Sequence, residues 1–215
     1  MTTWSPSRLR RDDATEPILG FRAWRLVLTP GGPRIGPTTP RPVWDPRTAP
    51  AATCTGTHTR LYMVFDPTAT PHRCPDEGCT CGWHAVRDAS TLVRPGGPAA
   101  VVGQVSLWGK VIEHARGFRA EFAYPARLRL VCWRCVRTGR WPAVPAAVGV
   151  RDGAAEPACD EHAPRSLRGS DVTLDARNVE RELLDTYAVD LLPVEGLPPA
   201  DGVDLLTRIR RTVEG

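Results

Sequence analysis

VVGQVSLWGKVIEHARGFRAEFAYPARLRLVCWRC, residues 101–135, is the most regular stretch of the chain. Its first half places apolar side chains at alternate positions, namely Val101, Val105, Leu107 and Val111. A period of two is typical of a β-strand with one buried face. Gly117 follows Ala115 and Arg116 and suits the positive φ that a hairpin turn needs. The pattern therefore predicts a strand that reverses at residues 115–117.

The return strand repeats this alternation up to a pair of cysteines. One face carries Phe118, Ala120, Phe122 and Tyr124, and beyond Pro125 it carries Leu128, Leu130 and Cys132. Arg119 and Glu121 fall on the other face. We therefore expect an antiparallel meander whose last strand ends at Cys132 and Cys135, and we expect these two residues to lie in a metal site. The predicted fold class is α+β, a small sheet with zinc-binding turns and C-terminal helices.

Two pairs of metal-ligand residue types follow the meander. Cys132-x-x-Cys135 and Cys159-x-x-His162 are separated by 23 residues. Each pair bends two ligands toward one point, so together they predict a Cys3His zinc site. Free buried thiols at Cys132 and Cys135 with Cys159 at the surface are one alternative, and a redox dithiol is another. No thioredoxin-like βαβ pattern surrounds the pair, which argues against the dithiol.

A more diffuse group of the same residue types lies in a loop-rich segment. It comprises Cys54, His72, Cys74, Cys79, Cys81 and His84. We predict that four of them bind a second zinc, namely Cys54, His72, Cys79 and Cys81. Such a site would tie a long Pro/Gly-rich loop to the tight Cys79-x-Cys81 pair. Cys74 can replace His72 or Cys54 as a ligand, and His84 is a further alternative. A half-buried cysteine cluster with solvated histidines would need no metal.

Charged residues and a histidine gather around the predicted hairpin. They are Glu113, His114, Arg116, Arg119 and Glu121. We consider them a candidate binding surface for an acidic or polar partner. The alternative is the solvated face of a sheet with local ion pairs, each of which contributes little to stability.

Composition divides the chain into four parts. We expect a flexible N-terminus, a strand with a Cys/His-rich loop region, the meander with its zinc turn, and an acidic helical tail: residues 1–17, 18–98, 99–170 and 171–215. The strand in the second part is predicted from Ile18 to Leu28. Asp171 or Thr173 can cap the first tail helix. That helix would contain Leu174, Val179, Leu183 and Tyr187. A second helical stripe follows, with Val203, Leu206, Ile209 and Val213.

The charge of the chain is asymmetric. Residues 1–170 hold 23 Lys and Arg against 14 Asp and Glu, whereas residues 171–215 hold 5 against 10. The acidic tail is therefore a candidate docking element for a protein partner, and the basic body a candidate nucleic-acid surface. No apolar leader begins the chain and no stretch reaches 18 apolar residues, so we expect no export signal and no membrane contact. Seven cysteines in such a chain favour metal-bound thiolates in the cytoplasm.

Three motifs between Gly20 and Pro125 resemble those of a set of uncharacterised, mostly actinobacterial proteins. They are residues 20–24 (GFRAW), residues 79–82 (CTCG) after His72, and residues 107–125 (LWGKVIEHARGFRAEFAYP). Trp83 and His84 stand where those proteins usually carry an aliphatic–aromatic pair, and Cys74 is an addition. The resemblance covers about half of the chain. It implies no known activity, and it assigns no catalytic residues.

Familiar catalytic signatures do not occur in the sequence. The deaminase signature fails because Val131 precedes Cys132 and Ala85 and Val86 follow His84. P-loop, HExxH, GxSxG and dinucleotide-binding motifs do not occur either. The sequence therefore favours a zinc-stabilised, zinc ribbon-like binding or adaptor module that acts through protein–protein contacts. One alternative is a metal-dependent, hydrolase-like enzyme with an open site formed by Cys79, Cys81 and a histidine. The other is a nucleic-acid-binding zinc protein.

Overall fold

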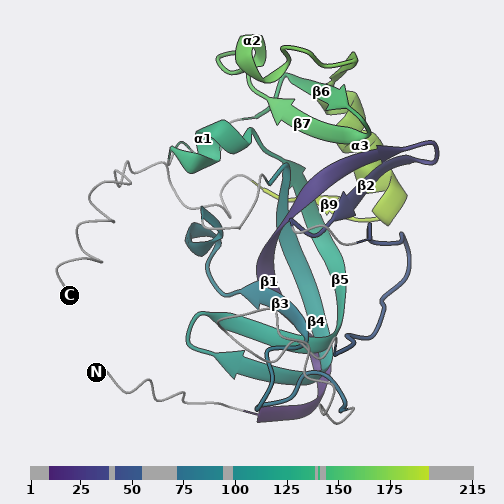
Figure 1. Cartoon of the computed structure of the whole chain (residues 1–215). Coiled ribbons are helices and arrows are strands. Elements are labelled where there is room, and N and C mark those ends of the chain that lie inside the picture. The colour runs from purple at the N-terminus through teal and green to yellow at the C-terminus, as the bar shows by residue number, and fades with distance from the viewer. Residues whose placement is uncertain are drawn as a thin grey trace, which may run out of the picture. The chain divides into compact units, whose positions relative to one another are not determined.

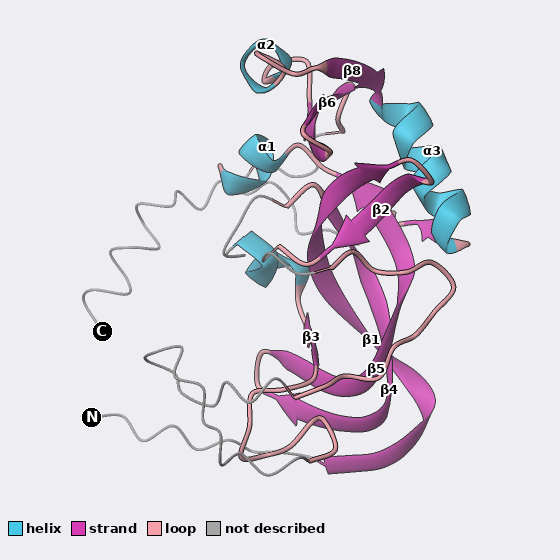
Figure 2. Ribbon diagram, turned by 45° about the vertical axis from the view of Figure 1, so that its right-hand side comes forward, coloured by secondary structure: helices cyan, strands magenta, loops and turns pink. Residues whose placement is uncertain are grey.

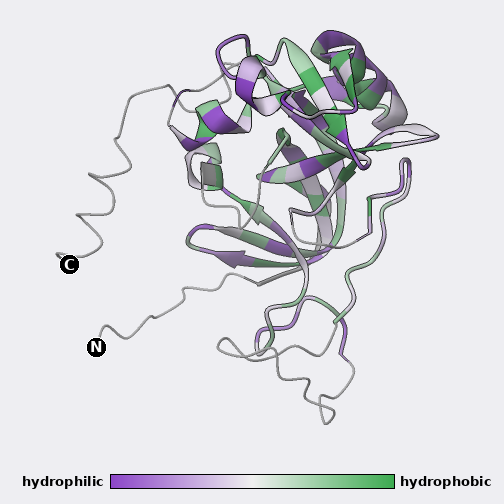
Figure 3. Ribbon diagram, turned by 45° about the horizontal axis from the view of Figure 1, so that its top comes forward, coloured by the Kyte–Doolittle hydropathy of each residue, from purple (hydrophilic) through white to green (hydrophobic). Residues whose placement is uncertain are grey.

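The fold is mostly antiparallel β-sheet with a few short helices, as the predicted α+β class requires (Figure 1). The structure is a computed structural model, and it describes residues 10–38, 42–54, 72–93, 99–138, 140 and 144–193. Strands and loops dominate this part of the chain, and the helices lie at the surface of the sheets (Figure 2). Hydrophobic and hydrophilic residues alternate along several strands (Figure 3).

The described strands are β1 (Arg10–Thr29), β2 (Gly32–Gly36), β3 (Trp83–Val86), β4 (Val101–His114), β5 (Gly117–Leu130), β6 (Ala147–Arg151), β7 (Ala154–Ala158), β8 (Val172–Asp175) and β9 (Asp190–Leu191). The described helices are the 3-10 helix η1 (Ala89–Val93), α1 (Trp133–Arg137), α2 (Ala163–Ser166) and α3 (Ala176–Tyr187). Hydrogen-bonded strands follow the order β3–β5–β4–β1–β7–β6–β8, with β2 on β1 and β9 parallel to β5. Because β3 also pairs with β1, strands β1, β4, β5 and β3 close a ring.

The described residues group into two compact units. One unit holds those within Met1–Arg22, Thr48–Asp88 and Gln104–Ala126. The other holds those within Ala23–Arg47, Ala89–Gly103 and Arg127–Gly215. Strands β1, β4 and β5 contribute residues to both, so the units differ from the four consecutive parts predicted. The strand predicted from Ile18 begins at Arg10, so residues 10–17, predicted to be flexible, lie in β1.

The alternation predicted for β4 is confirmed from Gln104 to Leu107, whereas Val102 and Ile112 on the other face are also buried. Its four apolar positions Val101, Val105, Leu107 and Val111 are each at most 1% exposed. On β5, in contrast, the predicted separation of faces is wrong, because Arg119 and Glu121 are as buried as their apolar neighbours. Loop residues cover them: the backbone N–H of Ala52, for example, donates to the carbonyl of Glu121 at 2.7 Å.

Gly117 is the first residue of β5, but its role differs from the predicted one of supplying a positive φ in the turn. Its φ is not positive. A Cβ atom at this position would lie only 2.1 Å from the carbonyl oxygen of Ala85 on β3. Gly20 on β1, in an identical Gly-Phe-Arg-Ala tetrapeptide, would place a Cβ 2.7 Å from the Cβ of Ala85. The two glycines therefore allow β1 and β5 to approach β3 closely.

The first helix of the predicted tail packs into its unit. The cap prediction is wrong, because Asp175 caps α3 by accepting a hydrogen bond from the N–H of Asn178 at 2.9 Å, and Leu174 lies in β8. Val179, Leu183 and Tyr187 are buried, as predicted. The second predicted helix, over residues 203–213, lies outside the described residues.

Tyr187 connects α3 to the rest of this unit. Its fully buried side chain donates a hydrogen bond to the carbonyl of Trp44 at 2.5 Å and accepts one from the N–H of Ile35 at 3.1 Å. Trp44 in turn packs against Trp24, with ring centroids 6.3 Å apart. Among the helices of the described residues, none has the length and apolarity that a membrane span requires.

Candidate metal centres

Two groups of thiols and imidazoles come together in the structure. The first Cys/His set consists of Cys54, His72, Cys79 and Cys81. The second Cys/His set consists of Cys132, Cys135, Cys159 and His162. Each set lies within one of the two compact units, and its four ligand atoms lie within 4.8 Å of one another. These are the two groups of four predicted from the spacing, and each could hold a metal ion.

Two tight turns build the second set. Strand β5 leads into Cys132, which stands at the N-terminal cap of α1, and Cys135 lies within that helix. Cys159 directly follows β7, and its carbonyl accepts a hydrogen bond from the N–H of His162 at 3.0 Å. The Sγ atoms of Cys135 and Cys159 are 3.6 Å apart. The Nδ1 atom of His162 lies 3.5 Å from the Sγ of Cys132 and 3.3 Å from the other two sulfurs.

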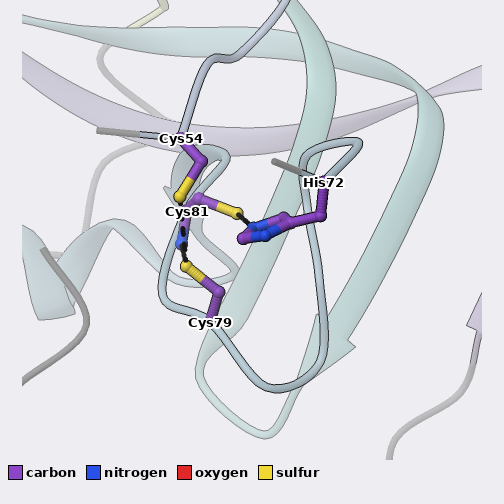
Figure 4. A group of neighbouring side chains, drawn as sticks. All are labelled: Cys54, His72, Cys79 and Cys81. Atoms are coloured by element: carbon purple, nitrogen blue, oxygen red, sulfur yellow. Dashed lines mark hydrogen bonds between the residues drawn. The ribbon is translucent and has the colours of Figure 1, made fainter. Parts of the chain in front are cut away.

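In the first set, three sulfurs and one imidazole face one another from separate loop segments (Figure 4). The Sγ atoms of Cys54 and Cys79 are 3.7 Å apart. The Nε2 atom of His72 lies 3.3 Å from the Sγ of Cys81. Gly82 follows with a φ of +118°, a conformation that favours glycine and lets the chain turn immediately after the last ligand.

These separations fit a tetrahedral ion. Metal–sulfur bonds of about 2.3 Å and metal–nitrogen bonds of about 2.0 Å give tetrahedral edges of about 3.8 Å between sulfurs and about 3.5 Å between sulfur and nitrogen. The observed distances of 3.6–3.7 Å and 3.3–3.5 Å are close to both values. A disulfide would bring two sulfurs to about 2.05 Å, so the cysteines of both sets are free thiols.

Arg119 on β5 organises the loop that carries two ligands of the first set. Its guanidinium donates to the carbonyls of Asp76 at 3.1 Å, Cys79 and Cys81 at 3.0 Å. Its Nε also donates to the Nε2 of His114 at 2.9 Å. Arg119 is only 6% exposed, so these carbonyls take the place of the water that would otherwise solvate its guanidinium. The sequence analysis placed Arg119 on a candidate binding surface and did not predict this supporting role.

Glu121, two residues further along β5, positions the other two ligands. Its carboxylate accepts two hydrogen bonds from Arg73, the neighbour of His72, at 2.7 and 2.6 Å. Its backbone carbonyl binds the N–H of Ala52, two residues before Cys54. A bidentate pair of this kind fixes geometry as well as charge. Arg73 was not recognised from the sequence, although its place beside His72 is a usable signal.

Burial raises the pKa of one ligand thiol in each set. For Cys159, by contrast, burial is outweighed by hydrogen bonds, chiefly from the backbone N–H of His162, which lower the pKa. Burial, with smaller contributions from Cys159 and Cys132, raises the pKa of Cys135 to about 12. Burial, together with a hydrogen bond from Cys74, raises the pKa of Cys81 to about 11. A bound metal ion reverses this effect, because it stabilises the thiolate that ligates it. The sets are therefore suited to release protons on metal binding.

The two alternative ligands stay outside the sets. Cys74 is buried beside the thiols of the first set, and burial raises its pKa. It is not one of the four residues that converge there. His84 lies on β3, and its Nε2 is 2.8 Å from the carbonyl of Thr80. Neither residue is needed to complete the four ligands.

The five hairpin residues do not form one surface. Arg119 and Glu121 are buried in the contacts described above, which overturns their expected place on an exposed binding face. Glu113 forms an ion pair with Arg87, and His114 contacts Arg119. Arg116 is exposed in the turn between β4 and β5. The structural role of the two buried members is to support the first Cys/His set.

No family model, curated protein or solved structure matches the chain. The resemblance to uncharacterised actinobacterial proteins therefore stays a prediction.

We predict that Glu121→Gln destabilises the protein by about 1 kcal/mol at neutral pH, because the 11% exposed carboxylate loses its charge while water still screens the 64% exposed Arg73. The hydrogen bonds from Arg73 hold the pKa of Glu121 below its usual range. The stabilisation is therefore present above the ordinary carboxyl range and is lost as pH falls through the lowered pKa. Denaturant unfolding from pH 3 to 7 should show a weaker acid dependence in the variant.

Glu161→Gln is the matched control. Arg140 lowers the pKa of Glu161 in the same way, but the Glu161 side chain is 61% exposed. Water screens such a pair, so the control should leave stability unchanged within error. Equal losses in the two variants would contradict the role given to Glu121.

Proposed function

We propose that this protein is a cytoplasmic binding or adaptor module whose two compact units are each stabilised by one structural zinc ion. The observation that carries the proposal is the pair of closed sets, each with three thiols and one imidazole at the separations of a tetrahedron. Their free thiols support a reducing compartment.

The donor chemistry favours zinc among the common metal ions. Thiolates are soft ligands that suit Zn²⁺, Cu⁺ and iron–sulfur clusters, whereas Mg²⁺ and Ca²⁺ take oxygen ligands. A tetrahedral Cys3His group is a usual structural zinc site. When bound, zinc would supply a cross-link between distant parts of the chain, joining Cys54 to Cys79 in the first unit and Cys132 to His162 in the second.

The same geometry argues against the hydrolase alternative. A catalytic zinc usually has three protein ligands and keeps the fourth position for water. In each set a fourth side chain is already within ligand distance of the others. Glu113, an acid of the hairpin, forms an ion pair with Arg87. A structural role therefore accounts for all eight ligand side chains.

The acidic tail was predicted to dock a protein partner, and within the described residues α3 belongs to this tail. The buried side of this helix packs into its unit through Val179, Leu183 and Tyr187. Glu182 and Asp185 are exposed on the helix. We place the docking of a basic protein surface on Glu182 and Asp185, which lie beside the exposed Arg177 and Arg181 of the same helix.

We predict two zinc ions per chain in protein purified without chelators. Cys79→Ser should remove one ion and Cys135→Ser the other, because three ligands bind zinc more weakly than four. Mass spectrometry of the metal content provides the measurement. Cys74→Ser is the matched control, since it removes a buried thiol outside both sets, and it should retain two ions.

The zinc proposal fails if the wild-type protein contains no zinc. It also fails if Cys74→Ser loses as much metal as Cys79→Ser, since the first set would then not be the four residues named.

The adaptor proposal predicts that Glu182→Lys with Asp185→Lys reduces capture of protein partners from extract by the immobilised full chain, because charge complementarity is lost. Arg177→Glu on the same helix is the control, and it should retain or increase capture. Capture that is the same for all three proteins would contradict docking on α3.

A further inference from the structure

The second Cys/His set holds two short helices next to each other. Cys132 and Cys135 flank the start of α1, and His162 directly precedes α2. Both helices pack against β7 (Figure 1). The Nε of Arg134 on α1 also donates to the Oγ of Ser166 on α2 at 2.8 Å. The two helices and their metal ligands therefore form one small module.

This module carries an excess of arginine. Residues 127–170 contain eight Arg and four acidic residues. Two of these acids pair with arginines, Glu156 with Arg134 at 3.4 Å and Glu161 with Arg140 at 2.6 Å. Four further exposed arginines have no carboxylate partner among the described residues. We call them the arginine cluster: Arg137, Arg151, Arg165 and Arg168.

Backbone contacts place Arg151 beside Arg168. Arg151 donates from Nε to the carbonyl of Gly169 at 2.7 Å and from its terminal nitrogen to the carbonyl of Arg168 at 2.8 Å. Arg165 lies in α2, three residues before Arg168, and Arg137 ends α1. Trp133 begins α1 and is partly exposed. Cations and an aromatic ring thus occur together on a module that the metal ligands hold in place.

We propose that the arginine cluster binds the phosphates of single-stranded nucleic acid and that Trp133 stacks on a base. Guanidinium groups match phosphate oxygens in charge and geometry. Stacking on an exposed aromatic ring needs an unpaired base, which a duplex does not offer. The inference rests on the proposed zinc at the second set, since that ion would fix α1 against α2.

The test measures binding of the zinc-loaded full chain to a fluorescent 20-nucleotide single-stranded DNA at several salt concentrations. Four phosphate contacts give a slope of log K against log salt of about −2.8. Arg137→Ala with Arg165→Ala and Arg168→Ala should weaken binding at least tenfold and reduce the size of the slope by about 2. Arg151 is left unchanged because it supports the backbone after α2.

The matched control removes three exposed arginines from other elements, Arg116, Arg177 and Arg181, by substitution with Ala. It changes the net charge equally, so it should stay within about threefold of the wild-type affinity if binding is local to the cluster. A duplex of the same sequence should bind more weakly than the single strand.

Equal weakening in the control, duplex binding as tight as single-strand binding, or affinity independent of salt would each overturn the inference. Zinc content is measured on the same preparations. A zinc-loaded wild-type protein that does not bind the oligonucleotide contradicts only this inference, whereas a zinc-free wild-type protein contradicts the proposed function.

Discussion

The meeting of four donor atoms in each Cys/His set is the constraint on which the rest of the structure depends. Each set joins two segments of the chain, Cys54 with residues 72–81 in the first set and residues 132–135 with residues 159–162 in the second. Holding such segments together costs conformational entropy, which a cross-link offsets. Without a cation, the side chains of each set would interact only through weak hydrogen bonds that involve sulfur. A metal ion at the centre turns the same group into a cross-link.

Strand β5 supplies the support that these sets need. Arg119 binds the carbonyls around Cys79 and Cys81, and Glu121 binds the neighbour of His72. The end of the strand leads into Cys132 of the second set. Hydrogen bonds of this kind, made to the backbone or to the neighbours of the ligands, orient metal ligands before the ion arrives. The buried charges on β5 are therefore explained by the loops they hold, and they do not form an exposed binding face.

Spacing and periodicity predict the parts of this structure that depend on local sequence. The alternation of β4 and the grouping of Cys132, Cys135, Cys159 and His162 follow from short patterns. The burial of Arg119 could not be predicted, because it depends on a loop 40 residues away that covers the strand.

Turn and cap residues were predicted less well for a related reason. Gly117 was expected to provide a positive φ, whereas it actually provides room for β3. Residues 172–175 form a short strand that pairs with β6, so the helix α3 begins only after it. Its cap is therefore Asp175 and neither Asp171 nor Thr173. The short strands β6 and β7 are rich in Ala, Gly and Pro, and β8 has only four residues. These strands form because they pair with one another, and a single sequence does not show which strands pair.

Thermal unfolding of the zinc-loaded protein before and after complete chelation tests the central claim most directly. If each ion cross-links its unit, each kcal/mol of lost stability should lower Tm by about 2–4 °C, so removing both ions should lower it by at least about 10 °C. Restoring zinc should return the original Tm. An unchanged Tm in protein shown by metal analysis to be free of zinc would contradict the account.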